Sequence, residues 1–189
     1  DALTIRENFG DVRGLTVVFM GDAKNNVANS LMVGCAKLGM NYVACCPEAD
    51  APDSELVEKC RAIAAENDCT VTVTSDVDEG TKGAHVIYTD IWVSMGEPAS
   101  LWEQRIKELS PYQVNAKVMA NAADNAIFMH CLPAFHDTKT TVAQEIEEKF
   151  GLTEMEVTDE VFEGAQSRVF DEAENRMHSI KAVVLATLR

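Results

Sequence analysis

The sequence has 189 residues, of which 47% are hydrophobic and 25% are charged. These values are typical of one globular domain with a full hydrophobic core, and they exclude disordered and fibrous proteins. The formal net charge of −15 argues against nucleic acid and anionic membranes as partners, because both attract basic surfaces. An anionic substrate must therefore be met by a few well-placed cations or by another domain.

The sequence has six cysteines but no C-x-x-C motif, and Cys45 and Cys46 are adjacent. This spacing suits neither a disulfide framework nor a zinc site, so we expect reduced thiols in a cytosol. No signal peptide, transit peptide or long apolar run indicates secretion or membrane insertion. The sequence starts at Asp1 rather than at a methionine, in what looks like the end of a helix, and we expect it to be a piece of a longer protein.

Five short apolar or β-branched runs predict strands, most of them separated by segments with helical patterning. The strands are expected at 15–20, 41–46, 70–74, 86–89 and 126–129, and the helices at 27–38, from 52 onward, and at 100–109, 112–121, 142–150 and 173–188. This alternation predicts an α/β fold, a doubly wound parallel sheet with a Rossmann-like three-layer architecture. In such sheets, ligands bind at the carboxyl ends of the strands.

The loop after the first expected strand contains Gly21, Asn25 and Asn26. A dinucleotide-binding fingerprint requires G-x-G-x-x-G, and only one glycine is present, so dinucleotide binding is not expected. Asn25 and Asn26 precede a helix and are N-caps by default. The functional alternative is that Asn26 turns its amide toward a ligand that lies across the strand ends.

Asp90 follows the fourth expected strand and leads into Ser94, Met95 and Gly96. Its carboxylate offers an anion to an ammonium group, whereas the serine hydroxyl and the backbone N–H groups of a turn suit a carboxylate. Together these groups match a zwitterionic amino acid. The structural alternative is that Asp90 caps a turn and Gly96 supplies a positive φ angle.

His130 and Cys131 lie where the fifth expected strand ends, because Pro133 cannot continue a ladder. Cysteine is commonly a small buried hydrophobe and histidine a hydrogen-bonded structural residue, so neither identifies a site alone. Asn26, Asp90 and Cys131, however, follow three different strands. We therefore expect them to converge on one rim of the sheet.

The last expected helix offers both charged and apolar groups. Glu172 and Arg176 have the i,i+4 spacing of a surface ion pair, but a guanidinium also suits a phosphate or a developing oxyanion. An apolar stripe on the same helix is expected to pack on the sheet or on a missing neighbour. It consists of Ala173, Met177, Ile180, Val184 and Leu188.

No metal ion or other cofactor is expected. The four histidines show no i,i+4 pairing, and His130 and Cys131 point to opposite faces in regular strand geometry. The same pair does not favour a Cys–His protease, because adjacent residues rarely form a nucleophile and its base.

Four segments, taken in order, resemble the ornithine carbamoyltransferases, specifically their carboxyl-terminal, ornithine-binding domain. They are Gly21-Asp22-Ala23-Lys24-Asn25-Asn26, Asp90-Ile91-Trp92-Val93-Ser94-Met95-Gly96, His130-Cys131-Leu132-Pro133 and Glu172-Ala173-Glu174-Asn175-Arg176. The resemblance covers nearly the whole chain. The S-M-G and H-C-L-P motifs are fairly specific within the carbamoyltransferases, and together they favour ornithine over aspartate as the acceptor.

The resemblance implies transfer of the carbamoyl group of carbamoyl phosphate to the δ-amine of ornithine, which gives citrulline and phosphate. It implies that the amino-acid end of ornithine is held by Asn26, Asp90, Ser94 and Met95. The δ-amine must be neutral to attack the carbonyl carbon, and most of the rate should come from positioning and from donors aimed at the oxyanion.

The catalytic residues implied by the resemblance are Cys131, His130 and Asp90. Cys131 would lie near the δ-amine, where a thiolate would accept its proton, whereas His130 would support the neighbouring groups. Cys131, the Leu132 carbonyl group and Arg176 would contact carbamoyl phosphate.

The family's amino-terminal domain, with its S-T-R-T-R phosphate loop and H-P-x-Q segment, is absent from the sequence. We therefore expect residues 1–189 to be the single ornithine-binding domain of a two-domain, cytoplasmic enzyme of arginine metabolism. In the family, the active site lies between the domains, and the homotrimer is built largely through the missing one. The chain alone is expected to be inactive, and its isolated form is expected as a monomer.

Two other functions fit the same rim. One is a non-catalytic module that binds an amino acid without reacting with it. The other is a carbamoyltransferase for putrescine or a modified ornithine; Asp90, Ser94 and Met95 argue against putrescine, which has no α-carboxylate.

Overall fold

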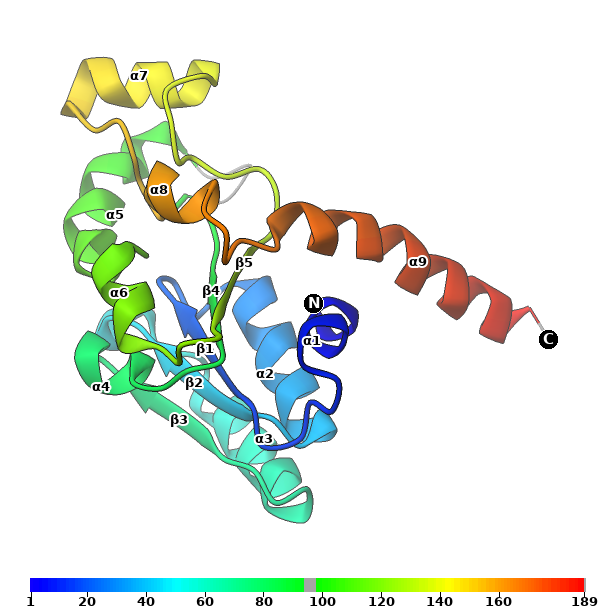
Figure 1. Cartoon of the computed structure of the whole chain (residues 1–189). Coiled ribbons are helices and arrows are strands. Elements are labelled where there is room, and N and C mark those ends of the chain that lie inside the picture. The colour runs from blue at the N-terminus through cyan, green and yellow to red at the C-terminus, as the bar shows by residue number, and fades with distance from the viewer. Residues whose placement is uncertain (94–97, 189) are drawn as a thin grey trace.

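The computed structural model describes residues 1–93 and 98–188 and contains one parallel β-sheet (Figure 1). Its strands are β1 (Thr16–Met20), β2 (Asn41–Cys45), β3 (Val71–Thr74), β4 (Val86–Thr89) and β5 (Ile127–His130). They lie in the order β3-β2-β1-β4-β5, and each neighbouring pair is parallel. The predicted doubly wound sheet is confirmed, and each strand end lies within one residue of its expected position.

Helices connect the strands and cover both faces of the sheet. They are α1 (Ala2–Phe9), α2 (Asn26–Leu38), α3 (Ser54–Glu66), α4 (Val77–Thr81), α5 (Trp102–Leu109), α6 (Ala116–Asn121), α7 (Thr141–Phe150), α8 (Asp159–Phe162) and α9 (Val169–Thr187), with the 3-10 turns η1 (Glu48–Asp50), η2 (Ala99–Leu101) and η3 (Ser110–Tyr112). None of the helices described here has both the length and the apolar character needed to cross a bilayer.

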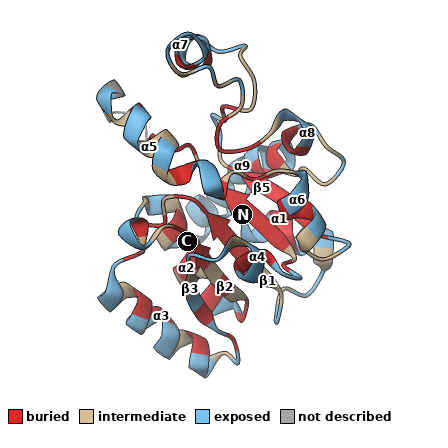
Figure 2. Cartoon of the chain, turned by 90° about the vertical axis from the view of Figure 1, so that its left-hand side faces the viewer, coloured by how far each residue is buried: buried red, intermediate tan, exposed pale blue. Residues whose placement is uncertain are grey.

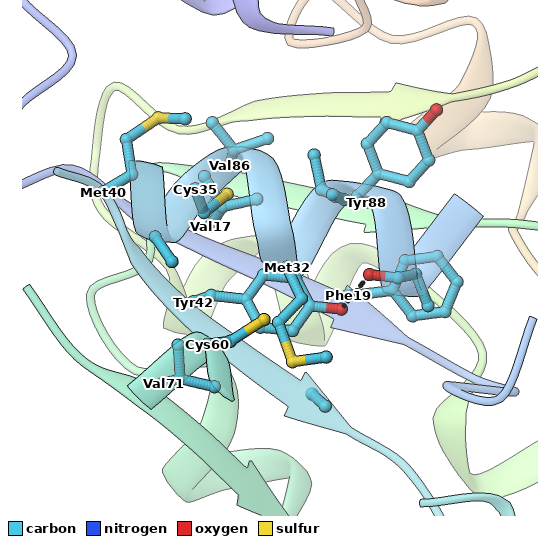
Figure 3. Packing of buried hydrophobic residues seen from close by; sticks show 14 of the residues in the cluster. Val17, Phe19, Met32, Cys35, Met40, Tyr42, Cys60, Val71, Val86 and Tyr88 are labelled. Atoms are coloured by element: carbon cyan, nitrogen blue, oxygen red, sulfur yellow. Dashed lines mark hydrogen bonds between the residues drawn. The ribbon is translucent and has the colours of Figure 1, made fainter. Parts of the chain in front are cut away.

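Alternate strand residues point to opposite faces, which places one apolar core on each side of the sheet. Val17 and Phe19 belong to the core under α1, α2 and α3, whereas Val18 and Met20 belong to the core under α4, α6 and α8. Figure 3 shows the first core, in which the Tyr42 hydroxyl donates a hydrogen bond to a carbonyl oxygen of α2 over 3.1 Å. The strands are buried between helices whose outer faces are exposed (Figure 2), so the three-layer prediction is confirmed.

A third apolar cluster forms from the segments that follow the carboxyl ends of β4 and β5. It includes Trp92 and Trp102. The Trp102 ring contacts the Phe135 ring edge to face, with ring centroids 5.9 Å apart. Ile146 adds the inner face of α7, which lies apart from the sheet (Figure 2). This cluster anchors α5 and α7 beyond the strand ends.

The last helix starts earlier than expected, and its apolar stripe is exposed. It begins at Val169 rather than at 173. Of the two places expected for its apolar stripe, the sheet and a missing neighbour, the structure excludes the sheet. Met177 is 55% exposed and Ile180 52% exposed, and α9 projects away from the rest of the chain (Figure 1). Only its first turns are held, in part by α1, where the Asn175 amide donates to the Glu7 carboxylate over 2.6 Å.

Two short elements also differ from the sequence prediction. The helix expected at 112–121 is shorter, because η3 ends at Tyr112 and α6 begins only at Ala116. Helix α4 was not expected, since it is only five residues long and contains Gly80; the Asp76 carboxylate caps it by accepting the Glu79 N–H.

A mostly buried ion cluster ties α5 to the carboxyl ends of β1 and β2. The Arg105 Nη2 atom lies 3.1 Å from Asp22 Oδ2, and its Nη1 atom lies 3.0 Å from Asp50 Oδ1. The three side chains are only 7–17% exposed. Two carboxylates at such low exposure require a cation, so this guanidinium stabilises both loops at once.

We therefore expect Arg105→Met, which keeps an apolar stem but removes the cation shared by the two carboxylates, to lower the free energy of unfolding by roughly 3 kcal/mol. Lys117→Met is the matched control, because Lys117 Nζ lies 3.0 Å from Asp78 Oδ1 but both side chains are more than 70% exposed. The Lys117→Met substitution should lower the free energy of unfolding by less than about 0.5 kcal/mol. Urea denaturation measures both, and equal losses would contradict the role of burial.

Candidate functional site

A cavity of about 700 Å³ opens beside the carboxyl ends of β4 and β5 and the first turns of α2 and α9. Its lining brings together six candidate residues from the sequence: Asn26, His130, Cys131, Leu132, Glu172 and Arg176. The parallel register explains their convergence, because Met20 pairs with Thr89 and Thr89 with His130. The loops after β1, β4 and β5 therefore leave the sheet at one edge.

The loop after β1 gives its two asparagines different places. Gly21 has a φ angle of +118°, which glycine adopts without strain, and this turns the chain at the strand end. Asn25 is the N-cap of α2, since its Oδ1 atom accepts the Ala28 N–H over 2.7 Å. Asn26, the first helical residue, is exposed and lines the cavity. Asn26 is therefore not needed as the cap.

Asp90 and Cys131 meet across the ends of β4 and β5. The Cys131 thiol donates a hydrogen bond to Asp90 Oδ1 over 3.0 Å, and the same oxygen accepts the Ile91 N–H over 2.8 Å. Burial, followed by the negative charge of Asp90, raises the pKa of Cys131 well above its ordinary value. This group is therefore a neutral thiol at physiological pH rather than a thiolate.

His130 is completely buried and is held through both ring nitrogens. Its Nδ1 atom contacts the carbonyl oxygen of Cys131, and its Nε2 atom lies 3.2 Å from Glu156 Oε1. The same glutamate oxygen accepts the Phe135 N–H over 2.6 Å. One buried carboxylate thus fixes both ends of the 131–134 loop, and neither ring nitrogen of His130 remains available to a ligand.

Glu172 also lies at the centre of the site rather than in a surface ion pair. It is 6% exposed; its Oε1 atom accepts the Tyr88 hydroxyl over 2.8 Å, and its Oε2 atom accepts the His130 N–H over 3.2 Å. Burial raises the pKa of this carboxyl group. The i,i+4 interpretation is therefore wrong for Glu172, whereas Arg176 is exposed and lines the cavity.

Two buried site residues were missed at the sequence level. Glu156 is one of 31 acidic residues and lies in an irregular segment, where no spacing or motif marks it. Tyr88 belongs to a buried strand, so its pattern predicts only core packing. Conversely, Ser94 and Met95, expected to hold the amino-acid end of a ligand, lie outside the described residues.

One group of described side chains has the donor types of a metal site. His136, Asp159 and Glu163 have ligand atoms within 4.8 Å of one another, at a surface away from the cavity. The His136 Nδ1 atom already pairs with Asp159 Oδ1 over 2.7 Å, its ring stacks on Phe162, and the charge of Lys139 faces both carboxylates. These contacts form a surface network of charged and hydrogen-bonding groups around His136 and Asp159.

The chain matches a known protein family. Residues 13–187 match the model of the aspartate/ornithine carbamoyltransferase Asp/Orn-binding domain. The chain is 63% identical over 188 residues to a catabolic ornithine carbamoyltransferase of Treponema denticola, and 54% identical over 191 residues to one of Lentilactobacillus hilgardii. Both matches cover all of this chain but only 56% and 55% of those proteins.

Solved structures agree with the sequence relatives. The ornithine carbamoyltransferase of Pyrococcus furiosus is 40% identical and superimposes with a TM-score of 0.83, over 97% of this chain and 53% of that one. The chain thus spans about half the length of the proteins it matches. Over that half, both its fold and its sequence match those of the relatives. The chain therefore belongs to the aspartate/ornithine carbamoyltransferase family, as an Asp/Orn-binding domain.

Proposed function

We propose that this chain is the ornithine-binding half of an ornithine carbamoyltransferase, which transfers the carbamoyl group of carbamoyl phosphate to the δ-amine of ornithine. The observation that carries the proposal is that Asn26, Cys131, Leu132 and Arg176 line the same cavity. Asp90 joins it through the hydrogen bond from the Cys131 thiol. The names of the relatives support ornithine as the acceptor.

The remainder of the reaction belongs to a second domain. This chain has a net charge of −15, and among the described residues that line the cavity Arg176 is the only lysine or arginine. A dianionic phosphate needs more positive charge than that. Carbamoyl phosphate is therefore held mainly by the other half of a two-domain protein. Residues 1–189 alone do not catalyse the reaction. The parent is a homotrimer, and the isolated domain is a monomer.

The amino-acid end of ornithine binds at the rim after β1 and β4. Asn26 presents its exposed amide there. The half-buried Asp90, which is bonded to the Cys131 thiol beside the cavity, supplies a carboxylate for an ammonium group. Ser94 and Met95 complete this subsite in the proposal on the basis of the family motif. Positioning of the substrate rather than a strong base then supplies most of the rate.

Proton transfer involves Cys131 and Asp90 together. The thiol and the carboxylate share one proton over 3.0 Å, and the pKa of the thiol is raised by burial and by the Asp90 charge. A bound δ-ammonium group brings a positive charge that offsets this effect. The ammonium group passes one proton to this pair, and the neutral nitrogen attacks the carbonyl carbon to form a C–N bond. The C–O bond to phosphate then breaks, and the departing phosphate takes the second proton from the nitrogen.

The remaining side chains position these groups. The Leu132 carbonyl group and Arg176 contact the carbamoyl group, where the guanidinium faces the developing oxyanion. His130 holds the loop that carries both Cys131 and Leu132, since its two ring nitrogens already contact Glu156 and the Cys131 carbonyl group. It supports the site and transfers no proton itself.

The compartment follows from cysteine chemistry. All six cysteines are free, and five of them are buried. Thiols remain in this state in a reducing cytoplasm, which is the location we propose.

Citrulline formation tests the function. We expect no citrulline from this chain alone, and rapid formation when it is mixed with the separately expressed remaining half of the full-length protein, ornithine and carbamoyl phosphate. Cys131→Ala should lower the rate of that mixture by about 100-fold or more, through loss of the proton-sharing pair. Cys60→Ala, in the core under α3, is the control and should keep the wild-type rate.

If the two halves associate, bind ornithine and yield no citrulline, the chain is a non-catalytic amino-acid-binding module. If putrescine reacts as well as ornithine does, the acceptor assignment is wrong.

The exposed stripe of α9 gives a second test, because we propose that the other half covers it. Ile180→Gln combined with Val184→Gln should weaken association of the halves by more than about tenfold, since two apolar side chains would no longer be buried there. The melting temperature of the isolated chain should not change, because both side chains are about half exposed. Lys181→Gln is the control on the same helix. Unchanged association in the double variant would place the contact elsewhere.

A further inference from the structure

Asn25 uses both ends of its side-chain amide. Its Oδ1 atom accepts the Ala28 N–H over 2.7 Å and caps α2, while its Nδ2 atom donates to Asp90 Oδ2 over 3.3 Å. An N-cap needs only the acceptor oxygen. The amide NH₂ group therefore adds a contact that capping does not require, and it joins the loop after β1 to the residue after β4.

The second contact completes a hydrogen-bonded chain that ends at the thiol. Asp90 divides its oxygens, since Oδ2 accepts from Asn25 whereas Oδ1 accepts from the Cys131 thiol and from the Ile91 N–H. A carboxylate at the end of a strand has a rotatable χ2 angle that local backbone contacts alone leave broad. Donors on both oxygens restrict that rotation.

Asn25 is itself held firmly. The Asp22 Oδ1 atom accepts the Lys24 N–H over 2.9 Å, which tightens the turn before Asn25. The other oxygen of Asp22 lies 3.1 Å from Arg105 on α5. A donor fixed at its base in this way orients its acceptor better than a mobile side chain does.

We propose that Asn25 is a positioning residue, whose amide NH₂ group holds the Asp90 carboxylate in the orientation that faces the Cys131 thiol. The role of this contact in binding ornithine rests on the proposed function. The contact between the three side chains does not.

The identity of the residue supports this role. Serine, threonine and aspartate cap helices about as well as asparagine. Only asparagine among them combines the cap acceptor with an amide donor long enough to reach a second residue. Aspartate would place a second carboxylate against Asp90, and serine is too short to reach it. The double contact therefore explains asparagine where capping alone does not.

The reactivity of Cys131 reports the orientation of Asp90. The ionisable groups around the thiol are Asp90 after β4, Glu172 on α9 and Tyr88 on β4, together with Asp1, His130 and Arg176 in the cavity lining. Of these, only Asp90 has a hydrogen bond with Asn25 among the described contacts. The other five cysteines are buried, so Cys131 is the thiol open to a reagent.

The test is the rate of Cys131 alkylation by iodoacetamide at fixed, mildly alkaline pH, followed by peptide mass spectrometry on this chain. Asn25→Ser keeps a cap oxygen but removes the donor. Asp90 then turns away, the pKa of Cys131 falls, and alkylation becomes about tenfold faster. Asp90→Asn, which removes the charge itself, sets the upper limit of that acceleration.

Asn115→Ser is the matched control, because Asn115 caps α6 through the Val118 N–H and lies away from the cavity. It should leave the alkylation rate unchanged. Asn25→Ala, which removes cap and donor together, should lower the melting temperature by roughly 3 °C more than Asn25→Ser does. Asn25→Thr, which also caps, repeats the test if the serine variant unfolds.

Wild-type alkylation rates in folded Asn25→Ser and Asn25→Thr would overturn the proposal and leave Asn25 as a helix cap only. Ornithine affinity of the same variants is a separate readout. Faster alkylation in the Asn25→Ser and Asn25→Thr variants, together with a wild-type chain that binds no ornithine, would support the positioning role and count against the proposed function, so the two failures are distinguishable.

Discussion

The site depends on the in-register parallel pairing of β1, β4 and β5. Because Met20, Thr89 and His130 lie side by side, the three strands end at the same edge of the sheet. The residues that follow these strands are therefore close neighbours. The thiol of Cys131 reaches Asp90 for this reason, although 41 positions separate them. A shift of one residue in any pairing would turn these side chains to the opposite face of the sheet.

Behind this rim lies a layer of buried polar groups that fixes the backbone rather than meeting a ligand. Glu156 and Glu172 are almost completely buried, and each accepts hydrogen bonds from two donors that belong to different segments. Burying a carboxylate is costly unless it is hydrogen-bonded, so these groups specify one arrangement of β5, its following loop and α9. The groups proposed to meet the substrates are more exposed.

The strands and the convergence of the rim could be predicted from the sequence because both follow from local rules. Apolar runs mark 86–89 and 126–129 as buried strands, and residues after parallel strands share an edge. The contacts of Glu156 could not be predicted, because they join an irregular segment to a strand end. Glu172 was misjudged for a related reason, since i,i+4 spacing says nothing about which turn of a helix sits on a sheet. The exposed stripe of α9 is proposed to be covered by the other half of the protein, which the sequence of this chain does not describe.

The most direct test of the account is NMR chemical-shift mapping of ornithine on the isotopically labelled chain at millimolar concentration. The account predicts shifts that cluster at Asn26, Asp90 and the 130–132 backbone, with little response to putrescine, which lacks the α-carboxylate. Shifts centred instead on the separate cavity between α6 and α8, lined by Met119, Val161 and Gln166, would contradict it. So would an equal response to the two ligands at the rim.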